Sequence, residues 1–193
     1  MARPKEFDTE VALSEAMDLF WSKGYEATSM SDLVEHLGLA RQSVYDTFGD
    51  KHDIYMAALR RYCEQRLAWM APLFRSERPV RAVLREYLEQ AIEWVTQSAE
   101  MRGCMLINAA VGLSSYDEEA RKLVADTWKT AGREMVAMLR RAQERGEIGA
   151  HQNPLALARF FASVMTGILV LSKATRDRQA LQDVAEVALK ILG

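Results

Sequence analysis

A cluster of hydrogen-bond donors occupies residues 41–47 of this 193-residue chain. Arg41 carries a fork of N–H groups that matches the two acceptors on the major-groove edge of guanine, and the amide of Gln42 matches adenine. Hydroxyl groups that suit phosphate oxygens or base edges follow on Ser43, Tyr45 and Thr47. Donors of these types at this spacing indicate contact with double-stranded DNA.

Two short helices joined by a tight turn would present these donors. Ser29 and Asp32 fit a capping box that begins the first helix, and Gly38 fits the left-handed position that ends it. The first helix carries one apolar stripe, made of Met30, Leu33, Val34 and Leu37. The second can turn three apolar side chains inward, namely Leu39, Val44 and Phe48. Residues 28–51 therefore predict a helix-turn-helix.

The helix starts that flank this unit extend the predicted DNA contacts. Thr28 and Lys51 each lie at an expected helix start, where free backbone N–H groups and the helix dipole favour an anion. The predicted DNA-contact set is Thr28, Ser29, Arg41, Gln42, Ser43, Tyr45, Thr47 and Lys51.

This stretch resembles the TetR/AcrR family of bacterial transcriptional regulators. The matching residues are A-M-D-L-F-W-S-K-G-Y-E-A-T-S-M-S-D-L at 16–33, followed by Gly38, Tyr45, Phe48, Gly49 and Lys51. Two positions depart from the family pattern: Ala40, where a Ser or Thr cap is common, and Val34, where a small Ala is usual. The resemblance implies a repressor that acts as a homodimer and carries a small-molecule inducer site among its later helices.

Charge excludes one mode of DNA binding. The whole chain has a net charge of −2, and residues 1–55 hold five Lys or Arg against eleven Asp or Glu, which gives 5 − 11 = −6. Such a segment cannot act as a non-specific basic coat. Binding would depend on a few placed cations, on helix N-termini and on two copies acting together. Arg3 and Lys5 fit either a short arm on the phosphate backbone or a solvated tail.

Several other classes of protein do not fit the sequence. The N-terminus has no apolar segment typical of a secretion signal, and the apolar run at 160–171 is shorter than the ~18 residues that span a bilayer, so a soluble cytoplasmic protein is expected. Cys63 and Cys104 form no C-x-x-C pair. We find no catalytic constellation and expect no enzyme activity, metal or cofactor.

The periodicity predicts an all-α protein of about nine helices, with a DNA-binding domain at 1–50 and a ligand-binding and dimerisation domain at 51–193. Asp8 and Gly24 bound the first helix. A fourth helix runs from Lys51 to Met70, because Pro72 disfavours its continuation. Caps are expected for three later helices, at Ser115 with Glu118, at Asn153 and at Asp177.

The second domain carries apolar residues with a few polar groups, a composition typical of a small-molecule pocket. The candidate lining residues are Tyr87, Trp94, Cys104, Asn108, Trp128, Phe161 and Met165, with Met101 and Met105 beside them. The alternative is that these side chains are ordinary core. Cys104, in turn, is either an inert buried thiol or, at a helix start, a sensor of oxidants or electrophiles.

Residues 155–172 form a helix that is apolar on nearly every side, which one small core cannot cover. We expect this helix and the last one to pair with their copies in a four-helix interface. The candidate interface residues are Phe160, Val164, Gly167, Ile168, Leu171, Val184, Ala188 and Ile191. The alternative is a helical adaptor or coactivator of the same fold that binds a protein partner, which an exposed groove instead of a cavity would indicate.

Overall fold

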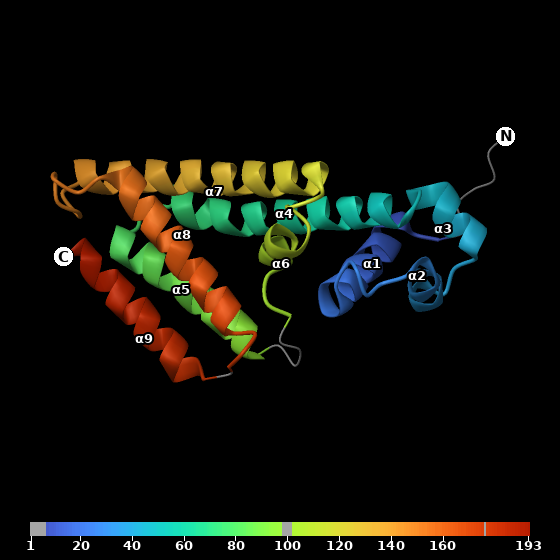
Figure 1. Ribbon diagram of the computed structural model, residues 1–193. Coiled ribbons are helices and arrows are strands. Elements are labelled where there is room, and N and C mark those ends of the chain that lie inside the picture. Colours follow the sequence, from blue (N-terminus) through green and yellow to red (C-terminus); the bar gives the residue numbers. More distant parts are fainter. Residues whose placement is uncertain (1–6, 98–101, 176) are drawn as a thin grey trace. The chain divides into compact units, whose positions relative to one another are not determined.

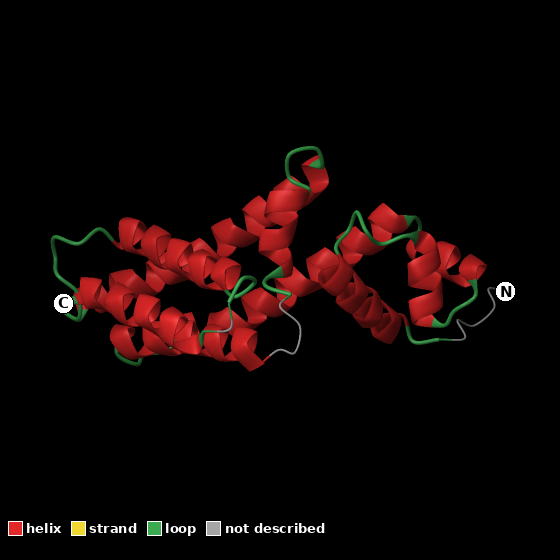
Figure 2. Ribbon diagram, turned by 60° about the horizontal axis from the view of Figure 1, so that its bottom comes forward, coloured by secondary structure: helices red, strands yellow, loops and turns green. Residues whose placement is uncertain are grey.

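The computed structural model describes residues 7–97, 102–175 and 177–193. Within these ranges the chain forms nine α-helices and one short 3-10 helix, with no strand (Figures 1 and 2). The all-α prediction is confirmed. Two compact units divide the chain, one ending at Glu64 and the other beginning at Gln65.

The helices of the N-terminal unit are α1 (Thr9–Lys23), α2 (Met30–Leu37), α3 (Arg41–Phe48) and the first part of α4 (Lys51–Arg75). The C-terminal unit holds the rest of α4, then α5 (Val80–Gln97), α6 (Met105–Gly112), α7 (Glu118–Glu144), α8 (Pro154–Leu171), α9 (Arg178–Leu189) and the 3-10 helix (Lys190–Leu192).

Local signals at the helix ends act as predicted in the N-terminal unit. The Asp8 carboxylate accepts hydrogen bonds from two backbone N–H groups at the start of α1. Ser29 and Asp32 form both halves of the capping box of α2, and Gly38 ends that helix with φ of +62°. Ala40 gives α3 no side-chain cap, a loss that typically costs about 1 kcal/mol.

Aromatic packing extends the N-terminal unit beyond the predicted boundary at residue 50. The rings of Phe20 and Tyr55 meet edge to face at 5.1 Å between centroids, and those of Trp21 and Tyr62 do the same at 5.1 Å. Fully burying a large apolar side chain stabilises a fold by about 1.5–3 kcal/mol. The first part of α4 therefore belongs to the core of this unit, which explains why the division follows Glu64.

The prediction that Pro72 ends the fourth helix is wrong, since α4 continues to Arg75. A proline inside a helix removes one backbone hydrogen bond and crowds the preceding turn. Here only the last turn is affected, and its Phe74 side chain is buried. The Phe74 carbonyl accepts a hydrogen bond of 2.6 Å from the Arg141 guanidinium. Burial and this bond offset the lost backbone contact.

In the C-terminal unit, α8 packs against α7, α5 and α9, and α5 also packs against α9 (Figure 1). Asn153 caps α8 and Asp177 caps α9, as predicted. The predicted cap of α7 is wrong, because Asp117 and not Ser115 accepts the hydrogen bond from the first turn. Both residues can cap a helix, so only the path of the chain before α7 decides between them.

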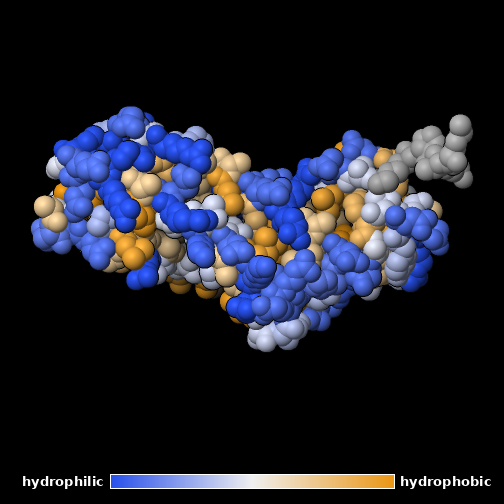
Figure 3. Space-filling view, turned by 90° about the horizontal axis from the view of Figure 1, so that it is seen from above, coloured by the Kyte–Doolittle hydropathy of each residue, from blue (hydrophilic) through white to orange (hydrophobic). Residues whose placement is uncertain are grey.

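By length and composition alone α8 could cross a membrane, with 18 residues and a mean hydropathy of 1.8. About one third of it, 33%, is buried within the chain. One such helix is weak evidence for a membrane span, because core helices of soluble proteins share this composition. On the face shown in Figure 3, hydrophobic areas are divided into small patches by hydrophilic side chains.

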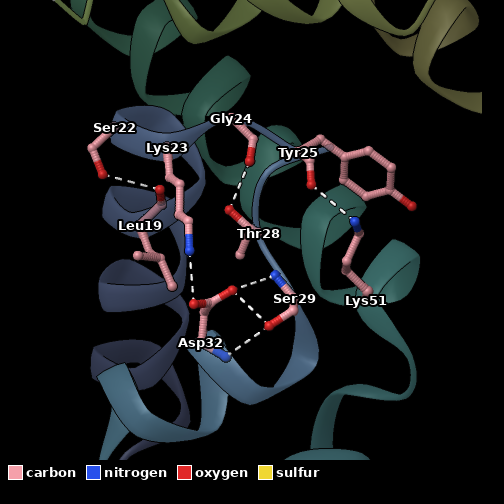
Figure 4. A network of polar contacts seen from close by, with 9 residues as sticks. All are labelled: Leu19, Ser22, Lys23, Gly24, Tyr25, Thr28, Ser29, Asp32 and Lys51. Atoms are coloured by element: carbon pink, nitrogen blue, oxygen red, sulfur yellow. Dashed lines mark hydrogen bonds and ion pairs between the residues drawn. The ribbon is translucent and has the colours of Figure 1, made fainter.

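An ion pair joins α1 to α2, and it gives a testable pH dependence (Figure 4). Lys23 lies 2.7 Å from the Asp32 carboxylate. The hydrogen bond from Lys23, followed by those from Ser29, holds the pKa of the Asp32 carboxyl well below its usual range. A lowered folded-state pKa stabilises the fold above the unfolded-state value of about 3.9, and this contribution is lost as the pH falls below it.

We expect thermal stability to fall between about pH 5 and about pH 2, and Asp32→Asn to lower stability at neutral pH while flattening this dependence. Lys23→Met should flatten the dependence only in part, because the hydrogen bonds from Ser29 remain, and the double variant should behave like Asp32→Asn. Circular dichroism melting curves at a series of pH values measure both effects. An unchanged slope in Asp32→Asn would contradict the assignment.

Candidate functional site

The outer face of α3 carries the hydrogen-bond donors that the sequence places there. Arg41, Gln42 and Tyr45 are exposed, whereas Ser43 and Thr47 are half-buried. The opposite face of the helix packs inward, with Val44 fully buried and Phe48 half-buried. Leu39, in the turn before α3, is half-buried as well.

Two pairs of side chains spaced four residues apart order this face. Arg41 donates a long hydrogen bond of 3.5 Å to the Tyr45 hydroxyl, and its guanidinium carbon lies 5.6 Å from the centre of the Tyr45 ring. Gln42 donates to the Asp46 carboxylate at 2.7 Å. Contacts at this spacing hold exposed side chains in a defined geometry before any ligand arrives.

Asp46 is a candidate that the sequence analysis missed. It is exposed on α3 and binds the Gln42 amide, so it places a carboxylate on the face that carries the donors. A carboxylate can accept a hydrogen bond from the cytosine amino group. The spacing of four residues from Gln42 was the available signal.

Thr28 does not present its hydroxyl to solvent. The residue is 1% exposed, and its hydroxyl donates to the Gly24 carbonyl at 2.6 Å (Figure 4). Its backbone N–H donates to the Tyr25 carbonyl at 3.2 Å. The predicted use of Thr28 as a phosphate donor is therefore corrected: both of its donors stabilise the loop before α2.

Lys51 also has a structural contact. Its ammonium donates to the Tyr25 carbonyl at 2.9 Å and lies 4.2 Å from the centre of the Tyr25 ring (Figure 4). It thereby ties the loop between α1 and α2 to the start of α4. An ammonium has three N–H donors, so a phosphate contact by Lys51 stays a prediction. So does one by Ser29, which is exposed while its hydroxyl donates to Asp32. Arg3 and Lys5 lie outside the described residues.

The C-terminal unit contains a cavity of about 470 Å³. Side chains from α4, α5, α7 and α8 line it, together with residues in and just before α6. Its apolar lining includes Met70, Phe74, Leu106, Ile107, Met135 and Leu169. A mostly apolar cavity of this size with a few polar groups is typical of a small-molecule site.

Four of the seven predicted pocket residues line this cavity: Tyr87, Cys104, Trp128 and Met165. Burial raises the pKa of Tyr87 to about 12, so its hydroxyl keeps its proton at neutral pH. Cys104 is buried and forms no disulfide. Trp128 is 47% exposed and lies at the edge.

The other three predicted pocket residues are not among those that line the cavity. Trp94 lies beside the Arg66 guanidinium, 5.4 Å from ring centre to carbon. Asn108 accepts from Lys173 at 2.9 Å and donates to the Arg102 carbonyl at 3.1 Å. Phe161 is fully buried in the core. Met101 lies outside the described residues. Helical periodicity identifies apolar faces but not which of them borders a hollow.

The predicted interface residues also divide by burial. Phe160, Leu171 and Ile191 are exposed, and Val164, Gly167 and Val184 are half-buried. Ile168 and Ala188 are buried within the chain, so they are core residues and not interface residues. Val170 and Val187 are exposed apolar residues of the same two helices that the prediction omitted.

A helix-turn-helix with ordered donors, joined to a helical unit with a cavity, defines the class of DNA-binding transcriptional regulators. Residues 12–58 match the family described as "Bacterial regulatory proteins, tetR family", and residues 80–188 match the "Tetracyclin repressor-like, C-terminal domain". The chain belongs to the TetR family of transcriptional regulators, and it is not an enzyme.

Relatives and solved structures agree with this assignment. The chain is 32% identical over 193 residues to the uncharacterised HTH-type transcriptional regulator YezE of Bacillus subtilis, covering 100% of both. It is 32% identical to the HTH-type transcriptional repressor ComR of Escherichia coli, covering 98% of this chain and 90% of ComR. A cysteine mutant of the TetR family regulator CifR, solved with a 26-base-pair operator DNA, has a TM-score of 0.88 at 29% identity, covering 100% of both chains.

If Arg41 reads a base, Arg41→Ala should cost about 1–3 kcal/mol at the preferred DNA site and relax preference at one position. Fluorescence anisotropy with the preferred sequence and single-base variants measures both effects. Arg140→Ala removes an exposed cation from α7 and is the control, with no change expected. Equal losses on all DNA sequences would instead place Arg41 on the phosphate backbone.

Proposed function

We propose that the chain is a homodimeric repressor that binds a short inverted-repeat operator and is released when a small molecule occupies the cavity of the C-terminal unit. The observation that carries this proposal is the cavity of about 470 Å³, together with the helix α4, which supplies side chains to it and to the N-terminal core. Such a regulator acts on DNA in the cytoplasm. ComR, by its name, is a repressor.

The charge of the N-terminal segment favours two copies acting together. With a net charge of −6 over residues 1–55, one unit makes few favourable phosphate contacts, and a second copy doubles them. A two-fold symmetric dimer that presents two copies of α3 about 34–36 Å apart would match successive turns of the major groove. The operator is then a pseudo-palindrome.

Exposed apolar residues on α8 and α9 support dimerisation through these helices. Leu171 is 47% exposed, Val187 65% and Ile191 42%. Nothing lies within 4 Å of the Cβ position of Gly167, so no neighbour in its own chain requires a glycine there. A small residue on an exposed helix face leaves room for a partner helix to approach closely.

The switch would act through α4. A ligand can shift a conformational equilibrium only if it binds one conformation better than the other. Complete release, from 1:99 to 99:1, requires about 5.5 kcal/mol of preference, whereas allosteric coupling usually supplies about 1–3 kcal/mol. By reciprocity, operator DNA should weaken ligand binding by the same factor.

A helical adaptor that binds a protein partner is the weaker alternative. Its protein partner would occupy an exposed groove. The lining residues Tyr87, Cys104 and Met165 are buried, whereas Trp128, Arg159 and Ser163 of the same lining are exposed. The buried part of the lining favours a small ligand.

Filling the cavity should uncouple release from DNA binding. Gly132 lines the cavity with open space at its Cβ position, so Gly132→Leu should fit and occupy ligand volume. We expect DNA affinity without ligand to be unchanged, and release by an inducer found by screening to be lost. Ala125→Leu, at an exposed position of the same helix, is the control and should respond normally. Normal release by Gly132→Leu would place the regulatory site elsewhere.

Substituting glutamate for exposed apolar residues of α8 and α9 tests the proposed dimer interface. Leu171→Glu and Val187→Glu should give folded monomers with weaker operator binding, because each places a carboxylate in the apolar interface. Val111→Glu changes an 80% exposed residue of α6 and should leave the dimer intact. Analytical ultracentrifugation reports the oligomer, and circular dichroism reports folding. If both the α8 variant and the α9 variant remain dimers, the exposed apolar face of these two helices is not the dimer interface.

A further inference from the structure

The described residues that line the cavity of the C-terminal unit include two cations and no anion. Among the described residues its lining includes Arg66 and Arg159 but no Asp, Glu or Lys. Neither guanidinium has a carboxylate partner in the described part of the chain. Other arginines of the unit do have one: Arg75 pairs with Glu134, Arg85 with Glu186, Arg121 with Glu118, and Arg145 with Glu77.

Arg66 is held in place by aromatic rings. Its guanidinium carbon lies 4.1 Å from the centre of the Trp69 ring and 5.4 Å from that of Trp94. Cation–π contacts of this kind orient a guanidinium while leaving its N–H groups available at the ring edge. Both rings line a second pocket, which Arg66 shares with Gln90, Glu93 and Gln97. Arg66 also lines the cavity, so its ordered charge is available to a ligand from that side.

A second donor lies beside it. Tyr87 is 5% exposed and lines the cavity, yet its hydroxyl has no hydrogen-bond partner among the described residues. Tyr87 packs against the same Trp69 ring as Arg66, with 5.6 Å between the centres of the two aromatic rings. Burial raises the pKa of Tyr87 to about 12, while the charge of Arg66 acts in the opposite direction. The Tyr87 hydroxyl is protonated and is not among the fully buried unpartnered atoms, so it is open to the cavity and can donate a hydrogen bond to a ligand there.

The Thr and Ser hydroxyl groups of the lining already donate hydrogen bonds to backbone carbonyls of their own helices. Thr127 donates to the Leu123 carbonyl at 2.7 Å, Ser163 to that of Arg159 at 2.9 Å, and Thr166 to that of Ala162 at 2.9 Å. Arg159 is exposed to solvent. Among the buried and half-buried lining residues, the available donors are thus those of Arg66 and Tyr87, and most of the remaining wall is apolar.

We propose that the ligand of this cavity is an organic monocarboxylate with an aromatic or branched apolar body, whose carboxylate is held by Arg66 and Tyr87. This inference rests on the proposed function, because it names the ligand of the same site. The guanidinium fork matches a carboxylate in geometry as well as charge. One negative charge suits the site better than the two of a phosphate, because a second charge beside apolar walls would be costly to desolvate.

The experiment is isothermal titration calorimetry of the full-length protein with phenylacetate and indoleacetate. Each acid is compared with its neutral amide and with the amine of the same body. We expect both carboxylates to bind and the amines not to bind detectably. The amides should bind at least ~10-fold more weakly than the acids, because losing a hydrogen bond between charged groups lowers affinity by about this factor.

Variants then assign the carboxylate to its donors. Arg66→Gln should reduce the affinity for the carboxylate to that for the amide, and leave the affinity for the amide unchanged. Arg66→Lys should give an intermediate affinity for the carboxylate, because lysine keeps the positive charge but lacks the paired N–H groups of the guanidinium. Tyr87→Phe should weaken carboxylate binding several-fold. Arg140→Gln removes an exposed arginine outside this cavity and should change nothing. Circular dichroism confirms that each variant is folded.

Equal affinity for acid and amide, no binding of either acid, or no effect of Arg66→Gln would each overturn the proposal. Repeating the titrations with DNA selected from a random pool separates it from the proposed function. Carboxylates that bind without releasing the DNA would leave the ligand class standing and defeat the switch. Release by neutral amides as strong as release by acids would defeat the ligand class and leave the switch standing.

Discussion

The helix α4 has to bury apolar side chains in two separate cores, and the rest of the molecule depends on this constraint. Ile54, Tyr55 and Leu59 are buried in the N-terminal unit, whereas Phe74 is buried in the C-terminal unit. A helix satisfies its backbone hydrogen bonds internally over its whole length, so it can serve both cores without a break. The continuation of α4 past Pro72 follows from the same requirement, because Phe74 must reach its core.

The helix-turn-helix and the cavity each carry a few ordered polar or charged side chains. On α3 the donors are held by neighbours on the same helix, Arg41 by Tyr45 and Gln42 by Asp46. In the cavity Arg66 is held by aromatic rings. With few cations near the DNA, the unit neutralises few phosphates, and the salt dependence of binding should be shallow for a DNA-binding protein. Specificity then depends on the placement of these side chains more than on total charge.

Much of the fold is determined by local sequence. The caps at Asp8, Asn153 and Asp177, and the capping box of α2, depend on residues within three positions of each other, so the order of the chain alone fixes their geometry. The exposed donors of α3 follow in the same way, because a buried Val44 fixes which residues point outward. For the same reason the helix-turn-helix could be predicted without any tertiary information.

Only the tertiary structure decided which side chains face which neighbour. Thr28 and Lys51 have the right types for DNA contact, yet loop carbonyls bind the hydroxyl of one and the ammonium of the other. Ile168 belongs to a helix that is apolar on nearly every side, so its sequence does not show which side faces the core. In the structure Ile168 is buried within the chain. Trp94 was expected to line the cavity, but it lies beside Arg66, a lining residue that composition did not single out. Periodicity in a sequence defines a face of a helix, but burial, hollows and charge pairing depend on residues distant in the chain.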